Sequence, residues 1–133
     1  MTASPVYAAP GGAIVCSDWA QTYTSDPAVD LKVELDDAAV EVTLDGAAVT
    51  GLTLPDPAGL FSTDMFDQTE TVSSRIARPG LDSVAIRRIS VTWSDTIIIS
   101  SLESDAPRIF WQRMRDDAGV LRETLFVGTC RAS

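Results

Sequence analysis

The sequence contains no histidine and no asparagine, and Lys32 is its only lysine. Without histidine the chain has no Ser-His-Asp or Cys-His catalytic arrangement and no imidazole ligand for a metal ion. Without asparagine it has no N-linked glycosylation site, and Asp and Gly must form the tight turns. No segment approaches the roughly 18 consecutive apolar residues of a transmembrane helix. These absences argue against most enzymes and against a helical membrane protein.

Acidic residues outnumber basic residues 19 to 10, which gives 133 residues a formal charge of −9. This charge repels nucleic acid, and no basic cluster is present to neutralise phosphate groups. Apolar residues make up 45% and charged residues 22%, which is typical of a folded globular domain. We therefore expect no direct binding to nucleic acid or to a membrane, and the acidic surface suits a cationic partner.

Alternation of apolar and polar residues over most of the chain predicts β-strands. Val40–Leu44 alternates in this way and is followed by Asp45-Gly46, a strong hairpin signal. Arg78-Pro79-Gly80 and Asp116-Asp117-Ala118-Gly119 indicate further turns. Repeated turns at spacings of about 8–12 residues are typical of all-β domains. The sequence therefore predicts a single β domain over residues 31–133, an antiparallel β-sandwich or a small barrel.

Residues 1–30 differ from the rest of the chain. They contain several prolines, many small residues and one short apolar stretch, Ala13–Cys16. This composition predicts an extended N-terminal arm with one short strand. Residues 1–17 contain no Lys or Arg and therefore lack the basic region with which an export signal begins.

Three finer expectations concern residues 83–102. The apolar phase shifts by one residue across Arg87-Arg88, which predicts a β-bulge. Ser94-Asp95 is expected to form a turn. The run Ile97–Ile99 that follows is expected to be buried on both faces of the sheet.

Few side chains offer chemistry. Asp36-Asp37 and Asp116-Asp117 lie in predicted turns, where carboxylates either supply oxygen ligands to calcium or simply cap the turn backbone. Trp93 and Trp111, with Phe110, form either an aromatic platform for a sugar or peptide or part of the core. No nucleophile motif or phosphate loop is present. We expect no enzymatic activity, no metal site and no cofactor.

The two cysteines, Cys16 and Cys130, lie near opposite ends of the chain. They are either reduced, buried thiols, as in a cytosolic protein, or a disulfide that joins the first strand to the last. The missing export signal favours the reduced thiols.

The stretch Arg108–Gly128 combines an aromatic and basic strand, an acidic turn ending in glycine and a returning strand. It resembles hairpins in the small all-β structural proteins of tailed bacteriophage particles, such as capsid cement proteins and tail or connector subunits. The resemblance implies a non-enzymatic virion subunit, assembled in the host cytoplasm, that contacts copies of itself or other particle proteins. We expect these contacts to involve the arm, the irregular middle of the chain and two arginines: Pro5, Tyr7, Pro10, Phe61, Met65, Phe66, Arg87 and Arg88.

A second resemblance lies in Phe126–Cys130, which is similar to the closing strand of small calycin-like or lysozyme-inhibitor barrels. It implies a different function, that of a secreted or periplasmic binding or inhibitor protein. A disulfide between Cys16 and Cys130 would then staple the barrel, and the acidic surface would face a cationic partner protein. The redox state of the cysteines discriminates between the two functions.

Overall fold

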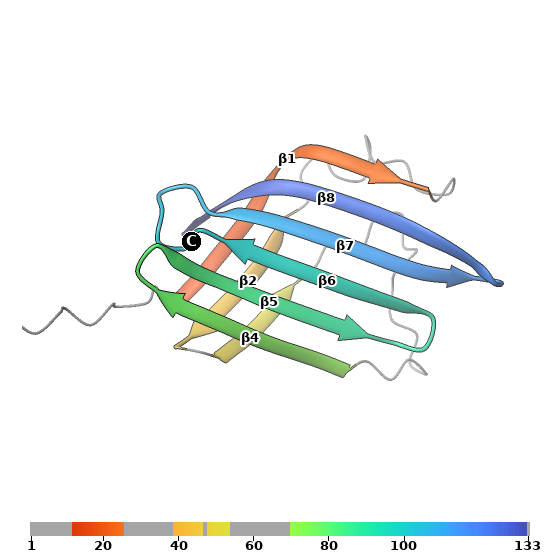
Figure 1. The fold of residues 1–133 in the computed structure, drawn as a ribbon, viewed down its shortest axis with the longest axis horizontal. Coiled ribbons are helices and arrows are strands. Elements are labelled where there is room, and N and C mark those ends of the chain that lie inside the picture. The colour runs from red at the N-terminus through yellow and green to blue at the C-terminus, as the bar shows by residue number, and fades with distance from the viewer. Residues whose placement is uncertain (1–11, 26–38, 47, 54–69, 133) are drawn as a thin grey trace, which may run out of the picture.

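The computed structural model describes residues 12–25, 39–46, 48–53 and 70–132, and these residues form strands and turns without any helix (Figure 1). The strands are β1 (Gly12–Thr24), β2 (Val40–Asp45), β3 (Ala48–Thr53), β4 (Glu70–Arg78), β5 (Leu81–Ile89), β6 (Trp93–Ser100), β7 (Arg108–Asp117) and β8 (Val120–Ala132). They form one antiparallel sheet in the order β3-β2-β1-β8-β7-β6-β5-β4. The all-β prediction is therefore confirmed.

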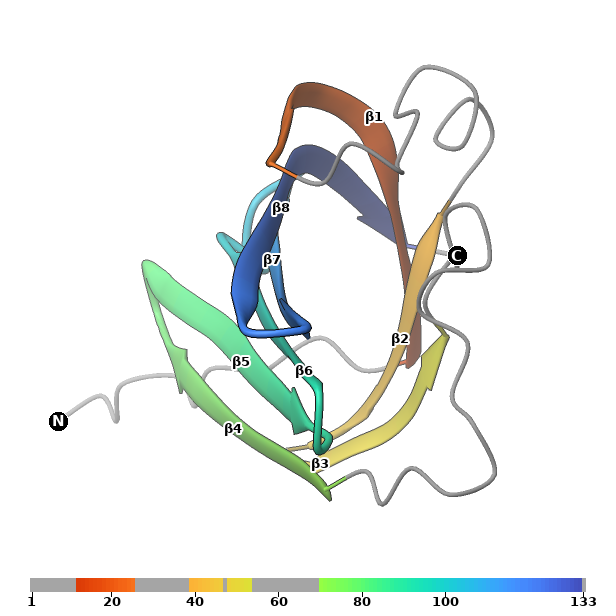
Figure 2. The same cartoon turned by 90° about the vertical axis from the view of Figure 1, so that its right-hand side faces the viewer.

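Neighbouring strands in the sheet are also consecutive in the sequence, except that β1 pairs with β8. The sheet curls so that β1, β2 and β3 face the other strands across a common interior (Figure 2). Its two edges, β3 and β4, come close together without pairing. Of the two predicted architectures, this nearly closed sheet resembles a barrel more than a sandwich.

The core fills the interior of this sheet. Alternate residues of each strand point inward, as the pleat of a strand requires. The side chains of Trp111 and Phe126 are fully buried, and Trp19 packs against both, with ring centroids 6.2 and 5.7 Å away. The remaining buried apolar members of the core are Ile14, Cys16, Val40, Val42, Leu44, Val84, Ile86, Ile97, Ile99, Leu102, Ile109 and Cys130.

Strand β1 is longer than the sequence predicts. Thirteen residues of the expected arm, Gly12–Thr24, form it, and it pairs with both β2 and β8. Its second half lacks a regular apolar alternation, but Trp19 packs against the core and cross-strand contacts to β8 hold it in place. The hydroxyl groups of Thr24 and Thr124 lie 3.1 Å apart, and the Ser25 N–H donates to the Glu123 carbonyl at 2.8 Å. This part of β1 is held by a strand about a hundred residues away in the sequence, so its own residues do not show the apolar alternation that would predict a strand.

Strand β1 bends where its register with β8 shifts, between Ser17 and Gln21. The bend turns on Asp18, whose φ is 52°, and it folds the ring of Trp19 over Gly128. A Cβ atom on Gly128 would lie 2.5 Å from the Ser17 carbonyl oxygen and 2.9 Å from Trp19 Cε3. Only glycine fits at this position, because both contacts are far inside van der Waals distance.

The disulfide bond joins β1 to β8. Cys16 lies directly opposite Cys130 in this strand pair, and their sulfur atoms are bonded at 2.00 Å. The expectation of two reduced thiols is therefore wrong for this structure. The antiparallel register brings the first and last strands side by side and turns both cysteine side chains into the same interior.

Two of the finer expectations for residues 83–102 are wrong. β5 pairs with β4 and β6 without a register shift, so no bulge forms at Arg87-Arg88. Arg88 takes the inward position and Ile89 points outward, where it is 40% exposed. The chain turns at Ser90–Thr92 rather than at Ser94-Asp95, and Asp95 is a fully buried residue of β6. A charged residue at an inward position thus imitates a break in the apolar alternation.

Burial of Ile97–Ile99 on both faces is also wrong, because Ile98 is 40% exposed on the outer face. Three of the predicted turns, in contrast, are present. Gly46, in the β2–β3 hairpin, Gly80, between β4 and β5, and Ala118-Gly119, between β7 and β8, all have the positive φ that tight hairpin turns require.

Candidate functional site

A row of polar side chains runs around one level of the interior. Each member is the register partner of the next, so the row crosses six neighbouring strands from β4 to β1. We call it the polar row; its members are Thr71, Arg88, Asp95, Arg113, Thr124 and Thr24. The neighbouring inward row contains Ile86, Ile97, Trp111 and Phe126. The interior is therefore layered, with polar groups next to the apolar core.

A buried ion pair lies at the centre of the polar row. Asp95 is fully buried and accepts hydrogen bonds from Arg113 Nε at 2.5 Å and Arg113 Nη2 at 2.7 Å. Its Oδ1 also accepts from Trp111 Nε1 at 3.1 Å. Arg113 is only 3% exposed, so both charges are sheltered from water and compensate each other. Asp95 is thus fully engaged by β7.

Arg88 is the other cation beside this aspartate. It is the β5 register partner of Asp95, and its guanidinium carbon lies 5.4 Å from the ring centroid of Trp93. The Arg113 guanidinium carbon lies 4.9 Å from the same ring. Trp93 therefore contacts both cations, an arrangement that is favourable because of the ring's quadrupole. Within the described part of the chain, Arg88 makes no ion pair.

Two more arginines lie one row further along. Arg115 is opposite Trp93 on one side and opposite Arg122 of β8 on the other. Arg122 Nη1 donates to the Ser25 carbonyl at 3.3 Å. Although the whole chain is strongly acidic, this end of the interior gathers guanidinium groups from β5, β7 and β8.

Arg75 ties the two edges of the sheet together. From β4 it donates two hydrogen bonds to Asp82, Nε to Oδ1 at 3.0 Å and Nη2 to Oδ2 at 2.9 Å, and both side chains are buried. Its Nη1 donates to the carbonyl of Gly46, in the turn between β2 and β3, at 2.8 Å. This contact bridges the seam between β3 and β4 in place of a strand ladder.

A cleft of about 270 Å³ opens along this seam. Its apolar wall is the inward side of β3, and the opposite wall is the end of the polar row on β4 and β5. The lining residues are Val49, Thr50, Gly51, Leu52, Thr71 and Arg88. The cleft thus offers apolar contact, hydroxyl groups and one guanidinium held against a tryptophan ring. Guanidinium groups pair with anionic groups, and the Val49 and Leu52 side chains offer apolar contact.

The structure separates the residues of the predicted interface. Arg87 is exposed on the outer face of β5, whereas Arg88 is half-buried and faces the interior. The remaining predicted contact residues lie outside the described residues: Pro5, Tyr7, Pro10, Phe61, Met65 and Phe66. The sequence treats Arg87 and Arg88 alike, and only the inward phase of the strand tells them apart.

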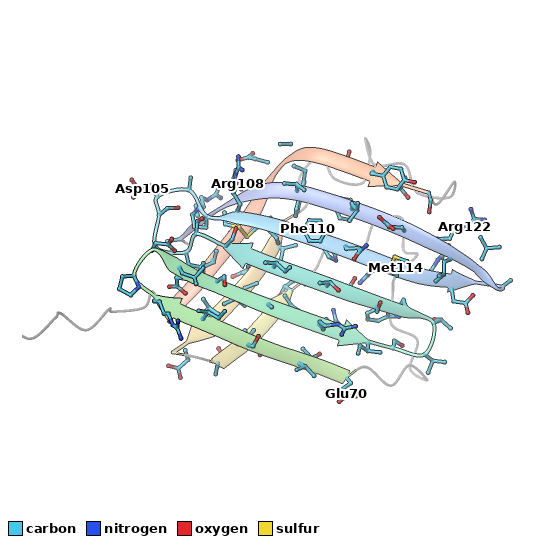
Figure 3. The ribbon with its side chains drawn as sticks, viewed as in Figure 1. Glu70, Asp105, Arg108, Phe110, Met114 and Arg122 are labelled. Carbon is cyan, nitrogen blue, oxygen red and sulfur yellow. A yellow bond between two sulfur atoms is a disulfide. The ribbon has the colours of Figure 1, made fainter. Side chains whose placement is uncertain are left out.

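The aromatic platform is not formed as predicted. Trp93 and Trp111 are buried and take inward positions. Phe110 points outward, as Figure 3 shows, and is 37% exposed. Asp116 Oδ1 accepts a hydrogen bond from the Gly119 N–H at 2.8 Å, which is the turn-capping role. Asp36-Asp37 lies outside the described residues. In the described ranges, no three acidic, cysteine or histidine side chains are placed to share a metal ion.

Sequence reasoning did not identify Asp95, Trp93 and Arg113 as one cluster. The available signal was the alternation Trp93, Asp95, Ile97 and Ile99, which places an aspartate in phase with buried residues. Comparison with protein-family models, with curated proteins and with solved structures finds no match to this chain. None of the described segments is a helix with the length and apolarity of a membrane span.

Proposed function

We propose that this chain is a non-catalytic binding protein whose ligand enters the seam cleft between β3 and β4. Of the two functions that the sequence leaves open, this corresponds to the disulfide-stapled barrel of a secreted or periplasmic protein, but with a small anionic ligand in place of the expected cationic partner protein. The observation that carries the proposal is the guanidinium of Arg88 at one wall of a cleft of about 270 Å³, with Val49 and Leu52 at the other wall. The ligand class is a small apolar carboxylate.

The geometry of Arg88 supports this ligand class. A guanidinium group matches a carboxylate through two parallel hydrogen bonds, provided that its orientation is fixed. The face of Trp93 restricts that orientation, and Asp95 is already occupied by Arg113. The carboxylate would therefore bind a preorganised cation, and its apolar part would lie against Val49 and Leu52.

The disulfide supports the proposed compartment. A bond between Cys16 and Cys130 persists where thiols are oxidised, as in the periplasm or outside the cell. It cross-links β1 and β8, the one pair of neighbouring strands in the sheet that is not consecutive in the sequence.

Isothermal titration calorimetry with octanoate tests the proposal, with octanol as the uncharged analogue. Arg88→Gln should weaken octanoate binding by about 10- to 100-fold, the effect of losing a charge-assisted hydrogen bond. Arg87→Gln is the matched control, because it removes the same charge from the next residue, on the outer face. The proposal fails if octanoate does not bind, if octanol binds as well, or if both variants have the same effect.

A subunit of a phage-like particle is the second candidate function. The outer face supports it with an apolar row in register across β5 to β8: Ala85, Ile98, Phe110 and Val127. Ile98 is 40% and Phe110 37% exposed, and Figure 3 shows Phe110 on this face. Light scattering of the untagged protein tests it. Rings or long polymers would favour this function over the binding protein, and a monomer or a small closed oligomer would count against it.

A further inference from the structure

Strand β4 is a free edge of the sheet. It pairs with β5 along its whole length, from Glu70 opposite Ile89 to Arg78 opposite Leu81. No described strand pairs with its other side, and all its residues except Arg75 are exposed. Backbone groups that point away from β5 can therefore pair with another strand.

This edge lacks the devices that usually protect such strands. A proline, a bulge or an inward-pointing charge commonly prevents pairing with another chain. β4 contains no proline, and its register with β5 is regular. Its inward charge, Arg75, is held within the protein by Asp82 and Gly46. At nine residues β4 is also longer than β3, the six-residue strand at the opposite edge.

We propose that two copies of this chain join through β4, as an antiparallel strand pair with a two-fold axis at Ser74. In this register Glu70 of each copy lies opposite Arg78 of the other, and Val72 lies opposite Ile76. Each contact occurs twice, as a two-fold interface requires. Val72 and Ile76 are 56% and 48% exposed in the single chain and become partly covered in the pair.

Backbone geometry limits the register, and charge selects it. Alternate residues of an antiparallel strand direct their N–H and C=O groups to one neighbour, and the other residues direct theirs to the opposite side. A two-fold axis at Ser74 places residues of the same alternate set opposite each other, so outward groups meet outward groups. A shift of two residues keeps this match but places Glu70 opposite Ile76 or Gly80 instead of Arg78.

Charge complementarity points to a second copy rather than to an unrelated strand. Within the described residues neither Glu70 nor Arg78 makes an ion pair, and their register partners on β5, Ile89 and Leu81, are apolar. Figure 3 shows Glu70 at the beginning of β4, on the margin of the sheet. The same nine residues, read in the opposite direction, supply the opposite charge at each end. Thr71 of β4 also lines the seam cleft, so the dimer and the proposed ligand are tested separately.

A charge swap tests the pairing in the full chain. Sedimentation over a concentration series should show a reversible monomer–dimer equilibrium for the unchanged protein. Glu70→Arg alone and Arg78→Glu alone each place like charges opposite each other twice and should weaken the dimer at least tenfold. Mixing these two single variants should restore a dimer, because each then supplies the charge that the other lacks. The double variant should also dimerise.

Two controls separate this pairing from other effects. Arg108→Glu changes net charge as Arg78→Glu does, but on β7 and far from the edge in Figure 3, and it should leave the dimer intact. Octanoate calorimetry on the single variants shows that failure to dimerise is separate from failure to bind. The inference is overturned if the unchanged protein is monomeric at every soluble concentration. It is equally overturned if the single variants dimerise normally or if their mixture stays monomeric.

Discussion

Reduction of the disulfide should remove a large part of the stability of this domain. Cys16 and Cys130 are 114 residues apart in the sequence, so the bond closes almost the entire described chain into one loop. In the chain-entropy treatment a loop of that length is worth about 5 kcal/mol at 25 °C. Domains of this size are stable by only about 5–15 kcal/mol. The reduced protein should therefore be close to its unfolding threshold.

Urea unfolding of the oxidised and the reduced protein measures this loss without changing any side chain. The reduced form should unfold at a much lower urea concentration, with free thiols confirmed by mass. The double variant Cys16→Ala with Cys130→Ala should behave like the reduced protein, with a small additional loss because Cys16 is fully buried. Reductant should have no effect on that variant. A difference below about 1 kcal/mol between oxidised and reduced protein would refute the reasoning, because the loop closure would then not constrain the unfolded chain.

Two further substitutions test the interior. Asp95→Ala leaves the Arg113 guanidinium buried without its carboxylate and should lower the free energy of unfolding by about 3–5 kcal/mol. Asp105→Ala, at an exposed position, is the control and should change this free energy little. Equal effects of the two substitutions in urea unfolding would show that the ion pair does not stabilise the fold. Gly128→Ala places a methyl group 2.5 Å from a carbonyl oxygen of β1 and should cost at least about 1–3 kcal/mol by overpacking. Thr129→Ala, the exposed neighbour, is its control in thermal unfolding, and similar melting temperatures for the two variants would contradict the predicted close packing.

Local residue patterns were sufficient to predict most strands and turns. Asp45-Gly46, Pro79-Gly80 and Ala118-Gly119 lie at hairpins because glycine adopts positive φ without steric cost. The alternation in Val40–Leu44 predicted β2 correctly, because one face of that strand is buried and the other is not. The alternation of Leu31, Val33 and Leu35 with Lys32 and Glu34 also predicts a strand, and it lies outside the described residues.

Local patterns failed where a charge occupies an inward position. Arg88 interrupts the apolar phase of β5 and so predicts a bulge, and Asp95 follows Ser94 as in a turn, but neither irregularity forms. The partners that make these charges acceptable are Trp93 and Arg113, on neighbouring strands. A short stretch of consecutive residues cannot show that a buried charge has its partner on a neighbouring strand.

Residue order alone is enough to predict a small, acidic, all-β chain with hairpins at defined glycines, because alternation and backbone preference are local properties. Which strands are neighbours follows only from the folded chain. The pairing of β1 with β8 brings Cys16 to Cys130, and the curl of the sheet brings Arg88 opposite β3 and leaves β4 as an edge. These contacts join segments distant in the sequence, since they depend on the burial of a common interior.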